Sequence, residues 1–285
     1  MALVLPTATC PWQSLLVLEA ETMSHDELKE AIEIFFAHFA AQHRFLSELP
    51  TLVDANCLLQ RYGTNPVPNV VMLQACVHLD ALARVTARGR GGTPRERFVS
   101  VLTEHSGVRT WGLVSLPELW GAIQHPGTVD SRRLRQQLEE IRTREEWSSP
   151  GPRLKEILLP REVAEMSRIV PADRIDRPVS QTLTALAGAG VCVDDICKAV
   201  VQEFTHAGIL YRDYRCALVH EARPKSRGWH FSPRQAPHYC ACEDDEILVC
   251  LVIPNQFVLK TLACLITILR EDCRRRSLNP FEFFP

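Results

Sequence analysis

The chain has 285 residues, of which 46% are hydrophobic and 23% are charged, and its formal net charge is −2. This composition is ordinary for a soluble globular protein with enough apolar residues for a core. The near-neutral charge excludes a generally basic chain, so a nucleic-acid site must depend on a local basic patch. Most cations are arginines, which suit bidentate phosphate contacts, although a compositional bias of the source genome explains the same excess.

Cysteine usage and the N-terminus bear on the compartment. Several of the 11 cysteines lie inside apolar helical patterns, and Cys76, Cys197 and Cys264 are expected to be small buried hydrophobes. Residues 1–18 are apolar but lack the basic start of a signal peptide and contain two prolines. No apolar run is expected to reach membrane-spanning length. These features predict reduced thiols, a cytoplasmic location and no membrane partner.

Helices dominate the predicted elements. Two capping boxes, Ser24 with Glu27 and Thr93 with Glu96, indicate helix starts, since each pair satisfies backbone N–H groups of the first turn. The stretch after Pro68 is apolar on nearly every side, which is typical of a central helix. The predicted helices of this part are residues 24–45, about 70–85, and a helix that begins at Thr93 with Pro94 in its first turn.

The middle of the chain is less apolar than its flanks. Ser115 starts a short helix, and residues 130–147 mix glutamates and arginines, which indicates a solvated helix or an arm. A further helix is predicted at about 154–169, followed by a loop that two prolines bracket. We interpret about 108–193 as a helical insertion in a single domain that covers residues 1–285.

The segment from Asp194 to about Glu221 predicts one long helix, because its apolar residues recur at helical spacing. At about 100° per residue, this apolar stripe keeps to one side, with Arg215 at its edge and His220 on roughly the opposite face. His220 lies in the last turn, where the helix dipole favours an imidazolium. An outward histidine near a guanidinium is what acid–base phosphoryl chemistry needs.

The C-terminal part predicts a β-hairpin and a closing helix. Residues 239–253 alternate around an acidic turn at 243–246, which is typical of a hairpin. Pro254 opens the last helix, and the three arginines at 274–276 fall where the C-terminal dipole favours cations.

The sequence gives little support for a metal or cofactor site. His238, Cys240 and Cys242 share one face of the predicted strand, but structural zinc sites usually use two-residue spacers and a second ligand pair. No phosphate-cradling glycine loop and no dinucleotide fingerprint occurs. We therefore expect no metal and no cofactor. The groups interpreted as structural or solvated are Cys192 with Cys197, His38 with His43, and the acidic run 243–246.

An arginine, four intervening residues and a histidine late in a long helix, here Arg215 and His220, resemble the signature of the HEPN superfamily. The apolar segment 73–83, which contains Asp80, resembles the early helix of such proteins, and residues 95–99 resemble the segment that follows. The hairpin and the closing helix resemble the end of the bundle.

The resemblance covers about 68–105 and 194–276. It implies a mainly α fold: a HEPN-like helical bundle with a small β-hairpin before the last helix and an inserted helical region. The helix at about 24–45 precedes this core.

The resemblance implies a metal-independent endoribonuclease. In the family, the arginine and histidine of two subunits face each other across a homodimer interface. The ribose 2′-hydroxyl attacks its own phosphate, His220 moves protons, and Arg215 stabilises the developing negative charge. The products are a 2′,3′-cyclic phosphate and a 5′-hydroxyl. Asp80 and Cys216 are supporting residues, although many catalytic members carry Asn, His or Asp where this chain has Cys216.

Further expectations concern partners. Arg212, Arg223, Lys225 and Arg227 surround the motif and are candidate RNA-phosphate contacts, although a solvated helix end and loop fits them as well. The expected partners are RNA, a second copy of the chain and an antitoxin or regulatory protein, in a defence or toxin role. The alternative is a non-catalytic HEPN module that binds nucleic acid or protein. Cys216 favours the alternative, and an outward His220 favours the enzyme.

Overall fold

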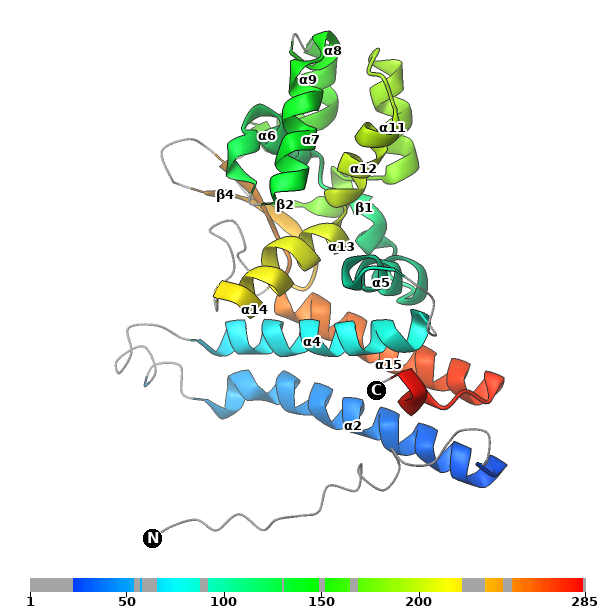
Figure 1. Ribbon diagram of the computed structural model, residues 1–285. Coiled ribbons are helices and arrows are strands. Elements are labelled where there is room, and N and C mark those ends of the chain that lie inside the picture. The colour runs from blue at the N-terminus through cyan, green and yellow to red at the C-terminus, as the bar shows by residue number, and fades with distance from the viewer. Residues whose placement is uncertain are drawn as a thin grey trace.

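The computed structural model describes residues 23–53, 57, 66–87, 92–129, 131–148, 152–164, 169–221, 234–242 and 248–283. Across these residues the chain is mainly helical with a few short antiparallel strands, which confirms the predicted fold class. Three long helices form the lower part of the molecule in Figure 1, and a group of shorter helices stands above them. The long helices are α2 (His25–Leu52), α4 (Val67–Ala87) and α15 (Asn255–Arg276).

Helix α2 begins where the sequence predicts and ends later. The Ser24 backbone N–H donates to Glu27 Oε2 at 2.7 Å, and the Glu27 N–H donates to Ser24 Oγ at 3.3 Å, which completes the capping box. The helix continues to Leu52, beyond the predicted end at residue 45. Leu46 is buried in the hydrophobic core to which α2, α4 and α15 contribute, which we call the lower core. The additional turns of α2 therefore bury one more apolar side chain.

Helix α4 is central, as its apolar pattern predicts. It packs against both α2 and α15, and Met72, Cys76 and Leu79 are fully buried. The expectation that no apolar run reaches membrane-spanning length is wrong for this helix, whose 21 residues pass a test of length and hydropathy. A core helix of a soluble protein passes the same test, so this finding is weak evidence for a membrane span.

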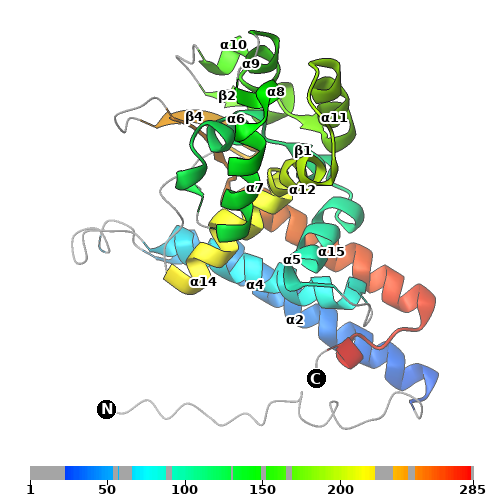
Figure 2. The same cartoon turned by 45° about the horizontal axis from the view of Figure 1, so that its top comes forward.

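The middle of the chain forms a second hydrophobic core. The charged stretch is a helix with one buried face and not an arm, because Leu134, Leu138 and Ile141 are buried against neighbouring helices. Figure 2 shows these upper helices standing over the lower layer. They are α6 (Leu116–Gln124), α7 (Arg132–Thr143), α8 (Glu145–Ser148), α9 (Pro152–Leu158), α10 (Arg161–Ala164), α11 (Val179–Gly188) and α12 (Asp195–Glu203).

Short elements connect the two cores. Thr93 and Glu96 form the predicted capping box of α5 (Pro94–Ser100). The predicted hairpin is confirmed, and the loop between prolines contains two strands of two residues that the sequence did not indicate. The strands are β1 (Leu113–Val114), β2 (Val170–Pro171), β3 (Arg177–Pro178), β4 (His238–Cys242) and β5 (Leu248–Val252), paired antiparallel in the orders β1-β3 and β2-β4-β5. The other short helical segments are η2 (Val101–His105), η3 (Arg109–Gly112), η4 (Pro126–Thr128), η5 (Ala172–Arg174) and η7 (Pro280–Phe283).

The prediction of one long helix over 194–221 is wrong. Helix α12 ends at Glu203, and Thr205 caps a new helix by accepting a hydrogen bond from the Gly208 N–H at 3.1 Å. A Cβ at Gly208 would lie 2.7 Å from the Glu203 carbonyl oxygen, so this break requires glycine. Beyond the break, α13 (His206–Ile209), the π-helical η6 (Leu210–Cys216) and α14 (Ala217–Glu221) follow one another directly. We call these three segments the Arg215 helix.

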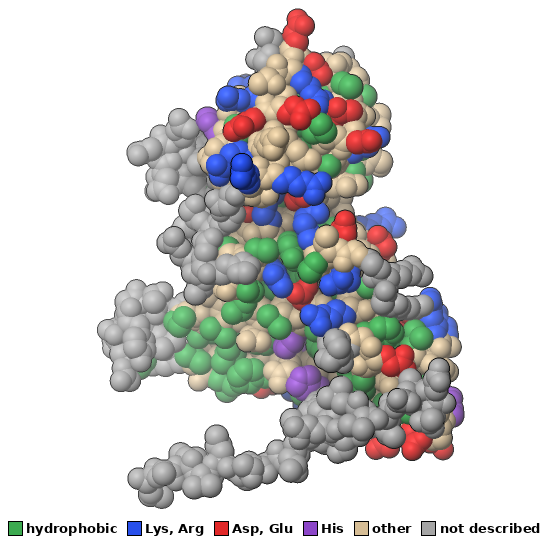
Figure 3. All heavy atoms as spheres, in the orientation of Figure 1, with side chains coloured by type: hydrophobic (Ala, Val, Ile, Leu, Met, Phe, Trp, Pro, Cys, Tyr) green, Lys and Arg blue, Asp and Glu red, His purple; other side chains and the backbone are tan. Residues whose placement is uncertain are grey.

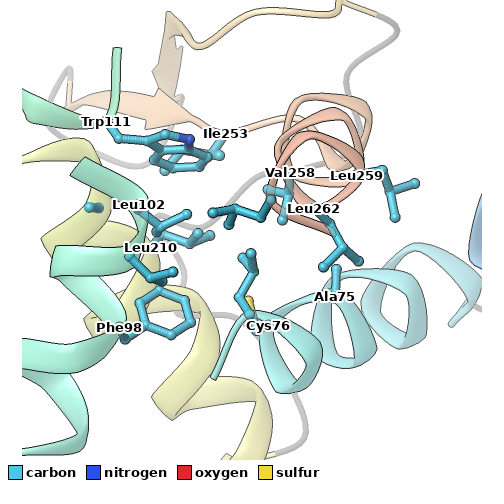
Figure 4. Close-up of a cluster of buried hydrophobic side chains, with 14 of the residues drawn as sticks. Ala75, Cys76, Phe98, Leu102, Trp111, Leu210, Ile253, Val258, Leu259 and Leu262 are labelled. Atoms are coloured by element: carbon cyan, nitrogen blue, oxygen red, sulfur yellow. The ribbon is translucent and has the colours of Figure 1, made fainter. Parts of the chain in front are cut away.

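The apolar stripe of the predicted helix is divided between the two cores. Val200 and Phe204 of α12 are buried in the upper core, whereas Tyr214 and Leu218 of the Arg215 helix are buried in the lower core. Figure 4 shows part of the lower core, where side chains from α4, α5, the Arg215 helix and α15 meet. There, Trp111 also donates its Nε1–H to Thr261 Oγ1 at 3.0 Å.

Exposure of the cysteines follows the prediction in part. Cys76 and Cys197 are buried as predicted, but Cys264 is exposed on α15, so its assignment to the core is wrong. No disulfide joins the cysteines whose side chains are described, which are Cys57, Cys76, Cys192, Cys197, Cys216, Cys240, Cys250, Cys264 and Cys273.

A buried polar network joins the upper helices, the hairpin and the Arg215 helix. The Asp176 carboxylate accepts hydrogen bonds from Tyr239 Oη at 2.7 and 2.8 Å, His206 Nε2 at 2.6 Å and the Leu116 N–H at 3.3 Å. Since the Tyr239 hydroxyl donates to the carboxylate, Ser115 Oγ donates to Tyr239 Oη, 2.8 Å away. The side chains of Asp176 and His206 have no exposed surface. A carboxylate taken from water in this way depends on these donors for its stability.

We expect Asp176→Asn to lower the free energy of unfolding by about 3 kcal/mol, because an amide presents one acceptor oxygen to donors that shared two. Tyr239→Phe removes one donor and should cost about 1–2 kcal/mol. The matched control is Asp173→Asn, since Asp173 is exposed in the neighbouring η5 and should change stability by less than about 0.5 kcal/mol. Denaturant unfolding measures all three, and equal losses at Asp176 and Asp173 would contradict this account of the network.

Candidate active site

Arg215 lies in the middle of the Arg215 helix and is fixed by a residue of α4. Its Nη2 donates to Asp80 Oδ2 at 2.7 Å, and the two side chains are 21% and 23% exposed. The structure thus brings together Arg215 and Asp80, a residue that the sequence analysis named only as a supporting one. The pair is half-buried, so the guanidinium is held in place but remains accessible from one side.

An aromatic ring supports the same guanidinium. The Arg215 Cζ lies 5.3 Å from the centroid of the Tyr211 ring, and Tyr211 in turn packs edge-on against Phe98 at 5.3 Å. Burial works against the charge of Arg215, but the hydrogen bond and charge of Asp80 outweigh it and raise the Arg215 pKa above its ordinary value. Arg215 is therefore a fixed cation between a carboxylate and an aromatic face.

The Cys76 thiol beside the pair is not an activated nucleophile. Cys76 is fully buried in α4, and burial raises the pKa of its thiol well above the ordinary value. Cys216, directly after Arg215, is half-buried. A reactive cysteine is a thiolate, so Cys76 is a structural residue at this site.

The π turn changes what the sequence implies about His220. The backbone of His220 lies in α14, five residues after Arg215, whereas its side chain lies outside the described residues. The inference that His220 lies opposite the apolar stripe assumed a regular α-helix throughout. Because η6 is π-helical over Leu210–Cys216, the residues after it are rotated relative to that pattern, and the assumption is wrong. Single π turns inside α-helices frequently occur at functional sites.

Arg212, predicted as a phosphate contact, is committed to neighbours within the fold. Its Nε and Nη2 donate to the two carboxylate oxygens of Asp213 at 2.8 and 2.6 Å, and its Nη1 donates to the Glu203 carbonyl at 3.1 Å. The side chain is 12% exposed and its guanidinium carbon lies 4.8 Å from the Phe204 ring centroid. Burial opposes the charge, but Asp213 raises the Arg212 pKa above its usual value. The structure thus gives Arg212 a role in joining α12 to the Arg215 helix.

The other predicted RNA contacts have no structural description. Arg223, Lys225 and Arg227 lie outside the described residues. Their role therefore stays a prediction from the sequence.

A rival acid–base site on α4 is disfavoured. His78 lies close enough to His38 and His43 of α2 for their charges to act on it. Burial, followed by the charges of His38 and His43, lowers the His78 pKa to about 4, so this imidazole is neutral near pH 7. Among the described residues, no three His, Cys, Asp or Glu side chains converge as metal ligands would.

Sequence reasoning missed the polar network around Asp176. His206 is a polar residue in an apolar stretch of chain, which is a recognisable signal of a buried partner. Asp176 lies in a loop far away in sequence, and no local pattern connects the two residues. The sequence analysis also did not identify the Tyr211 ring that supports Arg215.

We expect Asp80→Asn to lower the free energy of unfolding by about 1 kcal/mol, because it removes the charge that balances a half-buried guanidinium. A double-mutant cycle with Arg215→Gln should show a coupling of similar size. Asp195→Asn is the control, since the Asp195–Lys198 pair is exposed and Asp195 is 100% exposed. No coupling between Asp80 and Arg215 would show that the contact does not hold the guanidinium.

Comparisons with family models, with characterised proteins and with solved structures found no match to this chain. The resemblance to the HEPN superfamily therefore stays a prediction from the residues quoted for it. Any function has to be argued from the geometry of this chain.

Proposed function

We propose that this chain is a metal-independent endoribonuclease of the HEPN type, with Arg215 and His220 as its catalytic residues. The observation that carries the proposal is the half-exposed Arg215 guanidinium, which Asp80 and the Tyr211 ring hold in place. His220 follows in the next helical segment. A fixed cation on the same helix as a titratable imidazole supports phosphoryl chemistry, because the first balances charge and the second moves protons.

The proposed reaction begins with the ribose 2′-hydroxyl. His220 takes the proton from this hydroxyl, whose oxygen attacks the adjacent phosphorus. Arg215 stabilises the negative charge that gathers on the phosphate oxygens, and the leaving 5′-oxygen receives a proton. The histidine of a second copy is suited to this protonation, because each imidazole then carries one proton-transfer step. The chemistry needs no cofactor.

The assembly and setting belong to the same proposal. A homodimer brings two Arg215–His220 motifs together, and two-fold dimers are the commonest symmetric assembly. Val70 and Val77 of α4 and Val219 of α14 are exposed apolar residues on the two helices that carry the motif and its partner Asp80. Figure 3 shows hydrophobic side chains gathered over the lower helices. These exposed apolar residues support a dimer interface at this surface. We further propose that the chain is a cytoplasmic toxin or defence enzyme and that an antitoxin or regulatory protein restrains it.

A second candidate is a non-catalytic module that binds nucleic acid or protein. Two observations favour it: Asp80 already balances the charge of Arg215, and Cys216 occupies the position where many catalytic relatives in the resembled family carry a polar residue. In this case Arg215 serves mainly to fasten the Arg215 helix to α4.

We expect His220→Ala to lower RNA cleavage by roughly a hundred- to ten-thousand-fold, the usual contribution of a positioned acid–base group. Arg215→Ala should lower the rate by roughly a hundredfold or more, since the neutral side chain cannot balance the charge that gathers on the phosphate. Cys216→Asn should preserve or raise the rate if a polar residue is needed there. Cleavage and melting temperature are measured on the same preparations.

The matched controls are His125→Ala and Arg109→Ala, because both side chains are exposed and lie outside the proposed site. They should cleave RNA at the wild-type rate. A folded His220→Ala variant that cleaves normally contradicts the assigned site, and a wild-type protein that binds but never cleaves RNA supports the binding module.

A further inference from the structure

Arginines gather where the upper helices meet the Arg215 helix. Figure 3 shows Lys and Arg side chains across this level of the molecule, between the upper helices and α4. We call the arginines in the first turns of α5 and α7 the waist arginines. They are Arg95, Arg97, Arg132, Arg133 and Arg135.

The waist arginines are connected to Arg215 through a series of contacts. Arg133 and Arg95 both act electrostatically on Glu96, which places the start of α7 near the start of α5. Arg95 forms an ion pair with Glu203 at 2.8 Å, and the Glu203 carbonyl accepts a hydrogen bond from Arg212. Figures 1 and 2 both show the lower end of α7 close to the Arg215 helix. These contacts connect the start of α7, through α5 and Glu203, to the Arg215 helix.

Several of these guanidiniums are not neutralised by carboxylates. Arg97 donates to the Gly92 carbonyl at 2.6 Å, and Arg135 donates to the Val129 carbonyl at 2.9 and 3.0 Å. Within the described part of the chain, no ion pair involves Arg132 or Arg133, and both side chains are exposed. Within the described residues, Arg132 and Arg133 thus carry positive charge that no ion pair balances, although the whole chain has a net charge of −2.

The position of Arg132 and Arg133 is unfavourable for the isolated fold. Both lie in the first turn of α7, which has no acidic residue, and the N-terminal end of a helix dipole disfavours cations. Ser131 caps this helix, so its start is well defined. Cations at this end, together with unpaired N–H groups of the first turn, are suited to an anion.

We propose that the waist arginines bind the phosphate backbone of a single-stranded RNA that continues from the scissile phosphate at Arg215. The proposal rests on the proposed function for the RNA end at Arg215 and adds the path of the flanking strand. Arginine suits this role, because one planar guanidinium can donate two parallel hydrogen bonds to the oxygens of one phosphate. The helical insertion would then contribute to substrate binding through the start of α7.

The test measures binding separately from cleavage. The probe is a short, labelled single-stranded RNA with 2′-O-methyl groups, which cannot supply the attacking hydroxyl. Anisotropy titrations over a range of salt compare the full chain with the Arg132→Gln/Arg133→Gln double variant. For single strands, each lost phosphate contact reduces the slope of log K against log salt concentration by about 0.7. The double variant should therefore have a slope smaller by about 1.4 and an affinity roughly tenfold lower near physiological salt. Its melting temperature should stay equal or rise slightly, because the cations leave the positive end of the dipole.

The charge-matched control is Arg275→Gln/Arg276→Gln. These exposed residues lie at the C-terminal end of α15, and the variant has the same net charge as the test variant. It should bind the probe as the wild type does. If only the Arg132→Gln/Arg133→Gln variant binds the probe more weakly, the proposed path of the RNA strand along the waist arginines is supported. This holds even if the wild type cleaves no RNA, a result that would contradict only the proposed reaction.

Three results would overturn the path. Unchanged binding by the waist variant would do so, even if Arg215→Ala abolishes cleavage and the proposed reaction stands. Equal weakening in both double variants would show that only net charge matters. Binding of the wild type to anionic phospholipid vesicles, without binding to RNA, would assign the arginines to a membrane surface.

Discussion

The buried Asp176 carboxylate is the constraint on which the arrangement of the two cores depends. Its hydrogen-bond donors come from the hairpin, from the start of α6 and from the start of the Arg215 helix. Each donor belongs to an element that also packs in one of the cores, so a change at the carboxylate affects both. Because an unpaired buried charge is far less stable than a paired one, only a narrow set of relative positions satisfies all the donors at once.

This constraint determines where the Arg215 helix begins and, through its length, where the candidate site lies. His206 bonds to Asp176 at one end of the helix, and Arg215 bonds to Asp80 on α4 further along. The π-helical η6 lies in the segment that joins the contact of His206 to the contact of Arg215. The outcome is a guanidinium that is fixed by the scaffold and yet half-exposed. A guanidinium held in this way fits the proposed role of Arg215, since electrostatic catalysis needs groups that are already in place when the negative charge develops.

The parts of the fold that could be predicted depend on residues close together in sequence. The capping boxes at Ser24 and Thr93 join residues three apart, and the hairpin follows from alternation within one segment. The break near Gly208 was missed because the apolar stripe continues across it. The break combines a local cap, in which Thr205 accepts from the Gly208 N–H, with a distant bridge between Thr205 and Val114 of β1. The π turn was missed because an apolar stripe is recognised by assuming the same rotation of about 100° at every residue. A π turn changes this rotation. For the candidate site, the motif pointed to Arg215 and the resemblance pointed to Asp80. The Tyr211 ring lies four residues before Arg215, a local spacing that the sequence reasoning did not use.

We propose that the fixed Arg215 guanidinium serves 2′-hydroxyl attack on RNA. The most direct measurement is to incubate the full chain, in EDTA, with a defined RNA and with the same strand carrying one 2′-deoxynucleotide at the cleaved position. The account predicts a 2′,3′-cyclic phosphate and a 5′-hydroxyl from the RNA, and no cleavage at the deoxynucleotide. Cleavage at the deoxynucleotide, or products with a 5′-phosphate, would contradict it.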